Sequence, residues 1–170
     1  NNIKNISMDE KYAALCGITK EELLTQMSQD IDSLATRMKK TREDVIDALA
    51  YNYDGYHFTW PSPDIFNPYS LLNCFSDGKI SDYWFSSGTP TYLINMMRKF
   101  NVLPTSLGPM DAQNQDFDAP TERMTSLTPL LYQSGYITIK GYDEMFDSYK
   151  LDIPNHEVEL GLMRSLGHPH

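Results

Sequence analysis

Apolar residues in the first third of the chain recur with the period of an α-helix. The apolar positions of this pattern are Leu23, Leu24, Met27, Ile31, Leu34, Met38, Val45, Ile46 and Leu49. Thr19 with Glu22 has the spacing of a capping box, and Thr41 with Asp44 indicates another helix start. We therefore predict two or three short helices over residues 19–51, each packed at one side only.

Three later segments carry a capping residue followed by proline, a combination typical of helix starts. The pairs are Asn67-Pro68, Thr89-Pro90 and Thr128-Pro129. They predict helices over residues 68–75 and 90–100, and a third from 128 to a stop at Gly135. Asn155 caps a last predicted helix that extends to residue 165. Residues 81–85 fit either a short helix or an extended segment.

Residues 136–140 (YITIK) and 149–153 (YKLDI) alternate in the manner of β-strands. The polar segment 141–147 between them completes a predicted β-hairpin. The predicted fold class is therefore mainly α with a small β-hairpin (α+β). The order helix, helix, hairpin, helix is compatible with a winged-helix-like unit, which is a fold that serves many functions.

These elements suggest two units. We expect a helical subdomain over residues 1–103 and the winged-helix-like unit over residues 121–170. Residues 104–120 contain three prolines, one glycine and three aspartates, and are expected to form a long loop or linker between the units.

The net charge of −9 argues against a free-standing nucleic-acid binder, which needs a basic surface to neutralise phosphates. The chain is 41% hydrophobic and 22% charged, as globular proteins are. No apolar run approaches the roughly 20 residues of a membrane-spanning helix, and residues 1–9 show no secretory signal. Cys16 and Cys74 are far apart and are expected to be buried free thiols, which suits the cytoplasm.

A phosphate-binding loop requires the pattern GxxxxGK[ST], because its amides surround the phosphate oxygens and its lysine reaches them. The Gly78-Lys79 pair is followed by Ile80, and the sequence holds no such loop. Its cysteines and histidines lack zinc-ligand spacing, so no metal site is expected. Asp54 and His57 allow a proton-transfer pair; the alternative is a turn-closing aspartate beside a packed histidine.

Five segments of the chain carry a resemblance to a known family. They are residues 53–58 (YDGYHF), 66–73 (FNPYSLLN), 83–93 (YWFSSGTPTYL), 130–140 (LLYQSGYITIK) and 151–158 (LDIPNHEV). In this order they resemble segments of a predicted AAA-ATPase-like family of bacteria. The family is abundant in gut Bacteroidetes and often fused to a PD-(D/E)XK nuclease-like domain. Its patterns for the last four segments are YNPxSLLN, YWxxSGTPTxL, LLFQTGYLTIK and LxIPNxEV.

The resemblance implies an amino-terminal core, outside this chain, that binds ATP and Mg²⁺. It also implies a carboxyl-terminal nuclease-like module that begins where this chain stops. No catalytic residue is carried over, and no cofactor is expected in the chain itself. The motif positions best suited to docking on the core, or to sensing its nucleotide, are Asp54, Gly55, Tyr56, Asn67, Ser87, Gly88 and Thr89. Each of these residues could instead serve only to form a turn or to cap a helix.

Three interpretations of function remain open. The first is a non-catalytic lid or regulatory portion of an AAA-type ATPase, which is not an enzyme by itself. The second is a winged-helix nucleic-acid-binding domain with the hairpin as its wing, although that hairpin is predominantly acidic. The third is a protein-interaction module that uses the aromatic residues of the segment 53–60.

Overall fold

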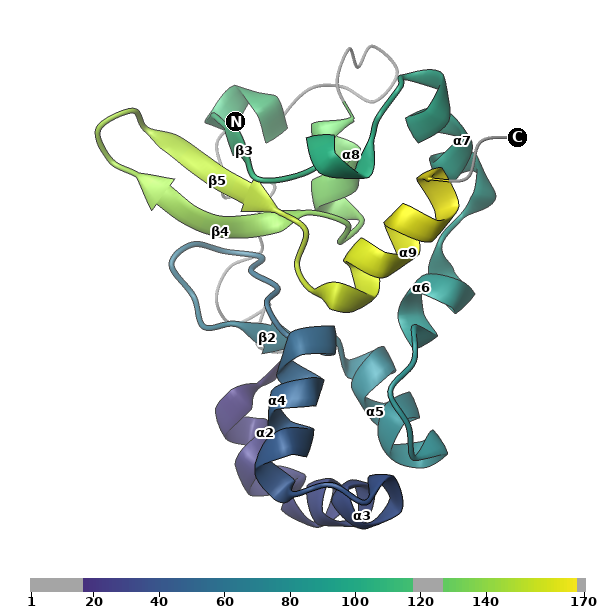
Figure 1. The fold of residues 1–170 in the computed structure, drawn as a ribbon. Helices are drawn as coiled ribbons and strands as arrows, with labels where there is room; N and C mark the ends of the chain where they lie inside the picture. Colours follow the sequence, from purple (N-terminus) through teal and green to yellow (C-terminus); the bar gives the residue numbers. More distant parts are fainter. Residues whose placement is uncertain (1–16, 118–126, 168–170) are drawn as a thin grey trace.

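The computed structural model describes residues 17–117 and 127–167 (Figure 1). Its elements are β1 (Ile18–Thr19), α2 (Lys20–Gln26), α3 (Ser28–Met38), α4 (Arg42–Tyr53), β2 (Ile65–Phe66), α5 (Pro68–Asp77), α6 (Tyr83–Gly88), α7 (Thr91–Lys99), η2 (Pro104–Ser106), β3 (Met110–Ala112), η3 (Asn114–Phe117), α8 (Thr128–Gln133), β4 (Thr138–Asp143), β5 (Ser148–Asp152) and α9 (His156–Leu166). Short helices dominate and the strands form two small antiparallel sheets, which confirms the predicted α+β class.

The helices α2 and α4 begin where their capping residues predicted. The amide of Glu22 donates to Oγ1 of Thr19, and the amide of Thr19 donates to the Glu22 carboxylate, which completes the capping box of α2. The hydroxyl of Thr41 caps α4 by accepting a hydrogen bond from the Asp44 amide. Residues 19–51 contain all of α2 and α3 and most of α4, in agreement with the two or three short helices that the sequence predicted. None of the helices in the described ranges is long and apolar enough to cross a bilayer.

Two hydrophobic clusters form the interior. The first lies among α2, α3, α4 and α5 and consists of Leu23, Ile31, Leu34, Ala35, Val45, Leu49, Tyr53, Phe66, Leu71 and Cys74. The second lies among α6 to α9 and the larger sheet, and includes Phe85, Leu93, Met97, Leu107, Phe117, Leu131, Tyr136, Ile139, Leu151, Val158 and Leu162. Figure 1 shows the helices of the first cluster below the sheet and the α9 helix.

The larger sheet has the strand order β3-β5-β4, so the second strand of the predicted hairpin is central. The hairpin itself is confirmed: Ile139 lies opposite Leu151, and the turn falls at residues 144–147. With α7 before β3 and α8 between β3 and β4, this part of the chain resembles a winged helix whose wing is the hairpin.

The expected linker over residues 104–120 is wrong in its centre. Residues 110–112 form β3, in which Met110 lies opposite Leu151 of β5. A three-residue strand among prolines carries too short an alternation to be recognised, and its partner lies far along the sequence. Residues 118–120 lie outside the described part.

The expected boundary at residue 103 does not match the division of the interior. Leu93 and Met97 of α7 belong to the second hydrophobic cluster, although they fall within the predicted first unit. The predicted cap of α7 is also displaced, because the helix begins at Thr91 after Pro90. The side chain of Thr89 instead accepts a hydrogen bond from the Tyr136 hydroxyl at 2.9 Å.

The two cysteines differ in what the structure shows. Cys74 is a buried free thiol, as expected, and burial raises its pKa to about 11. Cys16 lies outside the described residues, so the prediction for it stays a prediction.

Gly161 gives a test of the contact between α6 and α9. A Cβ at this position would lie 2.4 Å from Cγ of the Phe85 ring. We expect Gly161→Ala to lower the free energy of unfolding by about 1–3 kcal/mol, because overpacking outweighs the gain in helix propensity. Urea unfolding followed by circular dichroism measures the change.

Gly88→Ala is the matched control. A Cβ there would lie 3.8 Å from Nε1 of Trp84, which is ordinary contact. Its effect should stay within about 0.5 kcal/mol or be stabilising. Equal stabilities of the two variants would show that α9 does not press on Phe85 as described.

Candidate functional site

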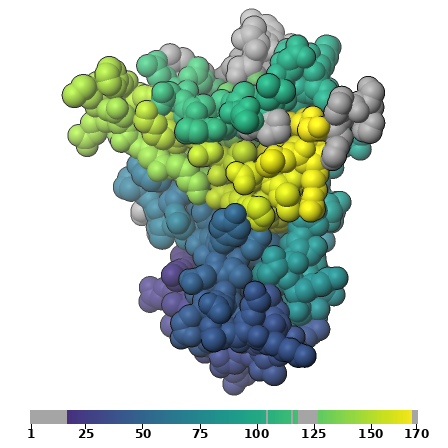
Figure 2. Space-filling model, viewed as in Figure 1, coloured from purple at the N-terminus to yellow at the C-terminus, as the bar shows by residue number. Residues whose placement is uncertain are grey.

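The five segments that carry the family resemblance meet between the two hydrophobic clusters. Figure 2 shows the yellow segment that contains α9 resting on the blue segment that contains α4, and these two helices are in contact. Several hydrogen bonds among the five segments join residues more than 70 positions apart. We call this set of contacts the motif interface.

Glu157 is at the centre of the motif interface. It lies in the first turn of α9 and is only 3% exposed. Its carboxylate accepts hydrogen bonds from the Ser70 hydroxyl at 2.7 Å, the Trp84 amide at 2.8 Å and the Phe85 amide at 3.0 Å. Burial raises the pKa of Glu157, and these three donors oppose that rise. One carboxylate therefore ties α9 to both α5 and α6.

The loop after α4 is held against β4. The His57 amide donates to Oγ1 of Thr138 at 2.8 Å, and that hydroxyl donates to the His57 carbonyl at 2.7 Å. Lys140 donates to the carbonyls of Gly55 at 2.6 Å and Pro154 at 3.0 Å. Lys140 is the extra residue at a register shift between β4 and β5, and such a bulge redirects a side chain.

Gly55 adopts a positive φ of 97°, a backbone conformation that glycine takes without a steric penalty. A Cβ at Gly55 would lie 2.4 Å from the Pro154 carbonyl oxygen, so only glycine allows this approach. Beside it, Asn155 donates to the Asp54 carbonyl at 3.0 Å and also caps α9 through the Val158 amide.

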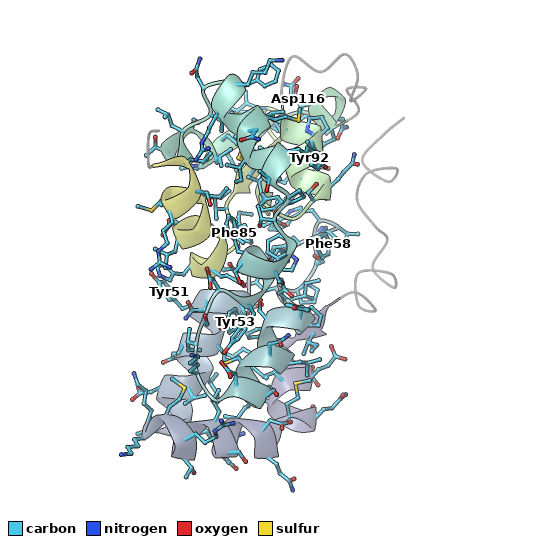
Figure 3. The ribbon with its side chains drawn as sticks, turned by 90° about the vertical axis from the view of Figure 1, so that its right-hand side faces the viewer. Tyr51, Tyr53, Phe58, Phe85, Tyr92 and Asp116 are labelled. Carbon is cyan, nitrogen blue, oxygen red and sulfur yellow. The ribbon has the colours of Figure 1, made fainter. Side chains whose placement is uncertain are left out.

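These contacts surround an open polar cleft of about 470 Å³. We call it the Asp54 cleft. It is lined by residues from the end of α4, the following loop, the bulge of β4 and the start of α9: Ala50, Tyr51, Asp54, Gly55, Asp64, Lys140, Asp152, Ile153, Pro154, Asn155, His156 and Glu159. Figure 3 shows Tyr51 at the foot of the α9 helix, where its ring stacks on that of His156.

Asp54 is the most unusual side chain of this cleft. It is 9% exposed, and its Oδ1 atom has no hydrogen-bond partner among the described residues. Burial raises its pKa to about 6, although the Gly55 amide and Lys140 lower it. A carboxyl group in this state changes charge close to neutral pH.

The proposed pair of Asp54 and His57 is not formed in this structure. His57 Nε2 instead contacts a carboxylate oxygen of Asp64, and its Nδ1 lies 3.1 Å from the Ser62 hydroxyl. Burial lowers the pKa of His57 despite the nearby Asp64. The packed-histidine alternative therefore describes this residue better, with Asp64 as a partner that sequence spacing did not indicate.

The seven predicted docking positions lie at three places. Asp54 and Gly55 line the Asp54 cleft. Tyr56 and Asn67 line a smaller pocket of about 230 Å³ with Phe58, Trp84 and Gly135. Ser87, Gly88 and Thr89 lie at the end of α6, outside both hollows, where the Ser87 hydroxyl donates to the Tyr83 carbonyl.

Sequence reasoning missed three important residues of this region. A carboxylate such as Glu157 is ordinary at a helix start, and nothing local in the sequence shows that this turn is buried. Lys140 and Asp64 gain their role only when β4 and the 55–65 loop meet. Membership of Lys140 and Glu157 in the resembling segments was the one signal that pointed to them.

Comparison with known proteins gives one relative. The chain is 29% identical over 168 residues to the "Uncharacterized protein in vnfD 5'region" of Azotobacter chroococcum mcd 1. This match covers 98% of the chain and only 30% of that protein, so the chain spans less than a third of its relative's length. No family profile and no solved structure matches the chain significantly.

The groups that line the Asp54 cleft are suited to recognition. Within residues 17–117 and 127–167, no group of three or more His, Cys, Asp or Glu side chains is placed to hold a metal ion. The Asp54 cleft offers carboxylates, one lysine and a stacked aromatic pair, which are groups suited to hydrogen bonding and charge pairing.

Glu157→Ala tests the motif interface. The substitution leaves the Ser70 hydroxyl and two backbone amides without their acceptor, so we expect the free energy of unfolding to fall by about 3 kcal/mol or more. Glu159→Ala, two residues later and largely exposed, should change it by no more than about 0.5 kcal/mol. Similar losses in the two variants, measured by urea unfolding at pH 7, would contradict the central place of Glu157.

Asp54 predicts a dependence of stability on pH. Its pKa is about 6 in the folded chain against an ordinary value of 3.8, so the native state retains a proton that the unfolded chain has released. This contribution to stability is complete below pH 3.8 and is lost as the pH rises through 6.

Asp54→Asn stays neutral and should not show this loss. We expect the variant to match the unsubstituted chain near the lower of these pKa values and to exceed it by up to about 3 kcal/mol above pH 7. Urea unfolding at a series of pH values measures the difference between the two proteins. A difference that is constant with pH would show that Asp54 does not titrate as described.

Proposed function

We propose that this chain is a non-catalytic, carboxyl-terminal regulatory portion of a longer AAA-type ATPase. In this proposal it docks on a nucleotide-binding core of the same polypeptide and forms a lid over the bound nucleotide or senses it. The core, and not this chain, binds ATP and Mg²⁺. The longer protein acts in the cytoplasm and carries a nuclease-like domain after this portion.

The observation that carries the proposal is the convergence of the resembling segments. Segments spread from residue 53 to residue 158 meet at the motif interface, where Glu157 joins α5, α6 and α9. Because the five short segments meet at one interface, their separate resemblances to the family have a common structural basis. The segments build the motif interface and contribute to the lining of the Asp54 cleft.

Two further observations support a role within a longer protein. The relative from Azotobacter is more than three times as long as the matched region, which leaves room for a separate core. The sequence of this chain has no GxxxxGK[ST] loop, and a nucleotide held by such a loop needs its amides and its lysine.

Protein interaction is the second candidate, and one feature favours it. Met145 and Phe146 at the tip of the hairpin are 83% and 68% exposed, and apolar side chains of this kind are frequent in protein interfaces. Nucleic-acid binding has less support, because the tip also carries Asp143, Glu144 and Asp147, which repel phosphates.

Calorimetric titration with ATP and Mg²⁺ tests the proposal. We expect no binding heat for this chain alone, because it lacks a phosphate-binding loop, and micromolar binding for the full-length protein. Deletion of this portion from the full-length protein should preserve nucleotide binding but change the rate of hydrolysis, since a lid acts on the bound nucleotide. The control is full-length protein with Glu144→Gln on the exposed hairpin turn.

Two results would overturn the proposal. The first is micromolar ATP binding by the isolated chain, which would place the site within these residues. The second is a full-length protein that neither binds nor hydrolyses ATP, in which case protein interaction becomes the better account.

A further inference from the structure

The tip of the hairpin between β4 and β5 carries apolar side chains that this chain leaves uncovered. Met145 and Phe146 are 83% and 68% exposed, which is more than the other large apolar residues that the structure describes. The hairpin projects away from the body of the chain (Figure 1). Its turn also holds three carboxylates and no basic residue: Asp143, Glu144 and Asp147. Exposed apolar groups of this kind mark an interaction site, and the acidic charge predicts a basic surface on the partner.

This hairpin tip, which we define as residues 143–147, has a defined shape. The carboxylate of Asp143 accepts hydrogen bonds from the amides of Met145 at 2.9 Å and Phe146 at 3.4 Å. At the base of the tip the rings of Tyr142 and Tyr149 lie with their centroids 4.9 Å apart. A segment that is ordered before it docks loses less conformational entropy on docking. The tip is therefore suited to enter a hollow on another surface.

A groove of the opposite charge lies between α6, α7 and α9, and we call it the α7 groove. Its volume is about 560 Å³, which lies within the range of roughly 300–1,000 Å³ that is common for ligand pockets. The apolar part of its lining is buried or half-buried and includes Phe85, Ile94 and Gly161. Its charged lining residues are the exposed Arg98 and Arg164 against one carboxylate, that of Asp82. In a chain with a net charge of −9, this groove is a local reversal of sign.

The two arginines have hydrogen-bonding capacity that the chain itself does not use. Arg98 donates from Nη2 to the Ser165 carbonyl at 2.6 Å, and a guanidinium has further N–H donors. Arg164 makes no hydrogen bond or ion pair with another residue of the described ranges. By contrast, the guanidinium of Arg42 is paired with the Asp32 carboxylate at 2.6 Å. A carboxylate that enters the α7 groove therefore finds unpaired donors.

The hairpin tip and the α7 groove lie on opposite sides of the chain. Figure 1 shows the hairpin projecting on one side and α6 and α7 on the other. Figure 3 looks onto this second side and labels Phe85, which lines the groove. A tip cannot reach the groove of its own chain in this fold. The two surfaces can meet only when they belong to different copies.

We propose that the hairpin tip of one copy docks in the α7 groove of a second copy. Met145 and Phe146 enter the apolar part of the groove, and the tip carboxylates pair with Arg98 and Arg164. The contact joins two different surfaces, so each pair still has a free tip and a free groove, and the assembly grows into a filament or closes into a ring. The inference rests on these two surfaces and not on the proposed ATPase role.

The association should be weak. A five-residue tip buries less surface than a stable dimer needs, and two copies that each carry a net charge of −9 repel one another at long range. We expect a dissociation constant on the order of 1 mM. Sedimentation equilibrium at increasing concentration measures it, and at about 1 mM the average mass should exceed that of the monomer by roughly 1.5-fold or more.

Two variants each remove one of the surfaces. The tip variant combines Met145→Ser with Phe146→Ser, and the groove variant is Arg164→Glu. Each should weaken self-association about 10-fold or more. The matched controls are Leu72→Ser on α5 and Lys40→Glu after α3, which change exposed residues of the same kinds elsewhere and should associate as the unsubstituted chain does. All these side chains are exposed, and urea unfolding checks that each variant folds.

A mixture of the two variants gives the decisive measurement. The tip variant keeps an intact groove, and the groove variant keeps an intact tip. An equal mixture should therefore form a one-to-one dimer with the affinity of the unsubstituted contact. This dimer should not grow further, because its free tip and its free groove are both altered. A dimer built from two tips would instead persist in the groove variant alone, and a dimer built from two grooves would persist in the tip variant alone.

Each outcome decides the proposal. Self-association that both variants weaken and that their mixture restores as a dimer supports it. A chain that stays monomeric at about 1 mM overturns it and leaves a basic surface of a different protein as the partner of the tip. Self-association that either variant leaves unchanged, or a mixture that stays monomeric, also overturns it.

Discussion

The arrangement of this protein depends on one buried carboxylate. Glu157 would be costly to bury without donors, and its three donors come from α5 and from the start of α6. The two hydrophobic clusters are therefore joined at a polar contact with a defined geometry, not only by apolar packing. The smaller pocket near Tyr56 is lined by residues of α5 and α6, which this contact brings together, and the Asp54 cleft lies at the start of α9.

The carboxyl-terminal half shows how little a fold says about function. Its sheet order and its hairpin resemble a winged helix, but Pro129, Leu131 and Tyr132 of α8 face the interior. The hairpin turn is acidic and apolar where a nucleic-acid-binding wing is basic. The same elements instead supply residues of β4 and α9 to the lining of the Asp54 cleft.

Local signals predicted the elements well, and non-local contacts account for what they missed. The Thr19 capping box and the hairpin are encoded within a few residues, so the sequence was sufficient for them. The strand at Met110 was missed because its partner lies about 40 positions away. The sequence around Glu157 indicates only a helix start, since burial by distant segments leaves no mark on neighbouring residues. Asp54 was selected through a resemblance, while its unpaired oxygen depends on packing that no spacing reveals.

The Glu157 contact also has a mechanical consequence. Because three donors share one acceptor group, a change in the angle between the clusters would break several hydrogen bonds together, at a cost of several kcal/mol. Ordinary thermal fluctuation does not supply that energy often. The described residues should therefore move as one rigid body, so that a displacement of the hairpin also displaces α2 and α3 without bending between the two clusters.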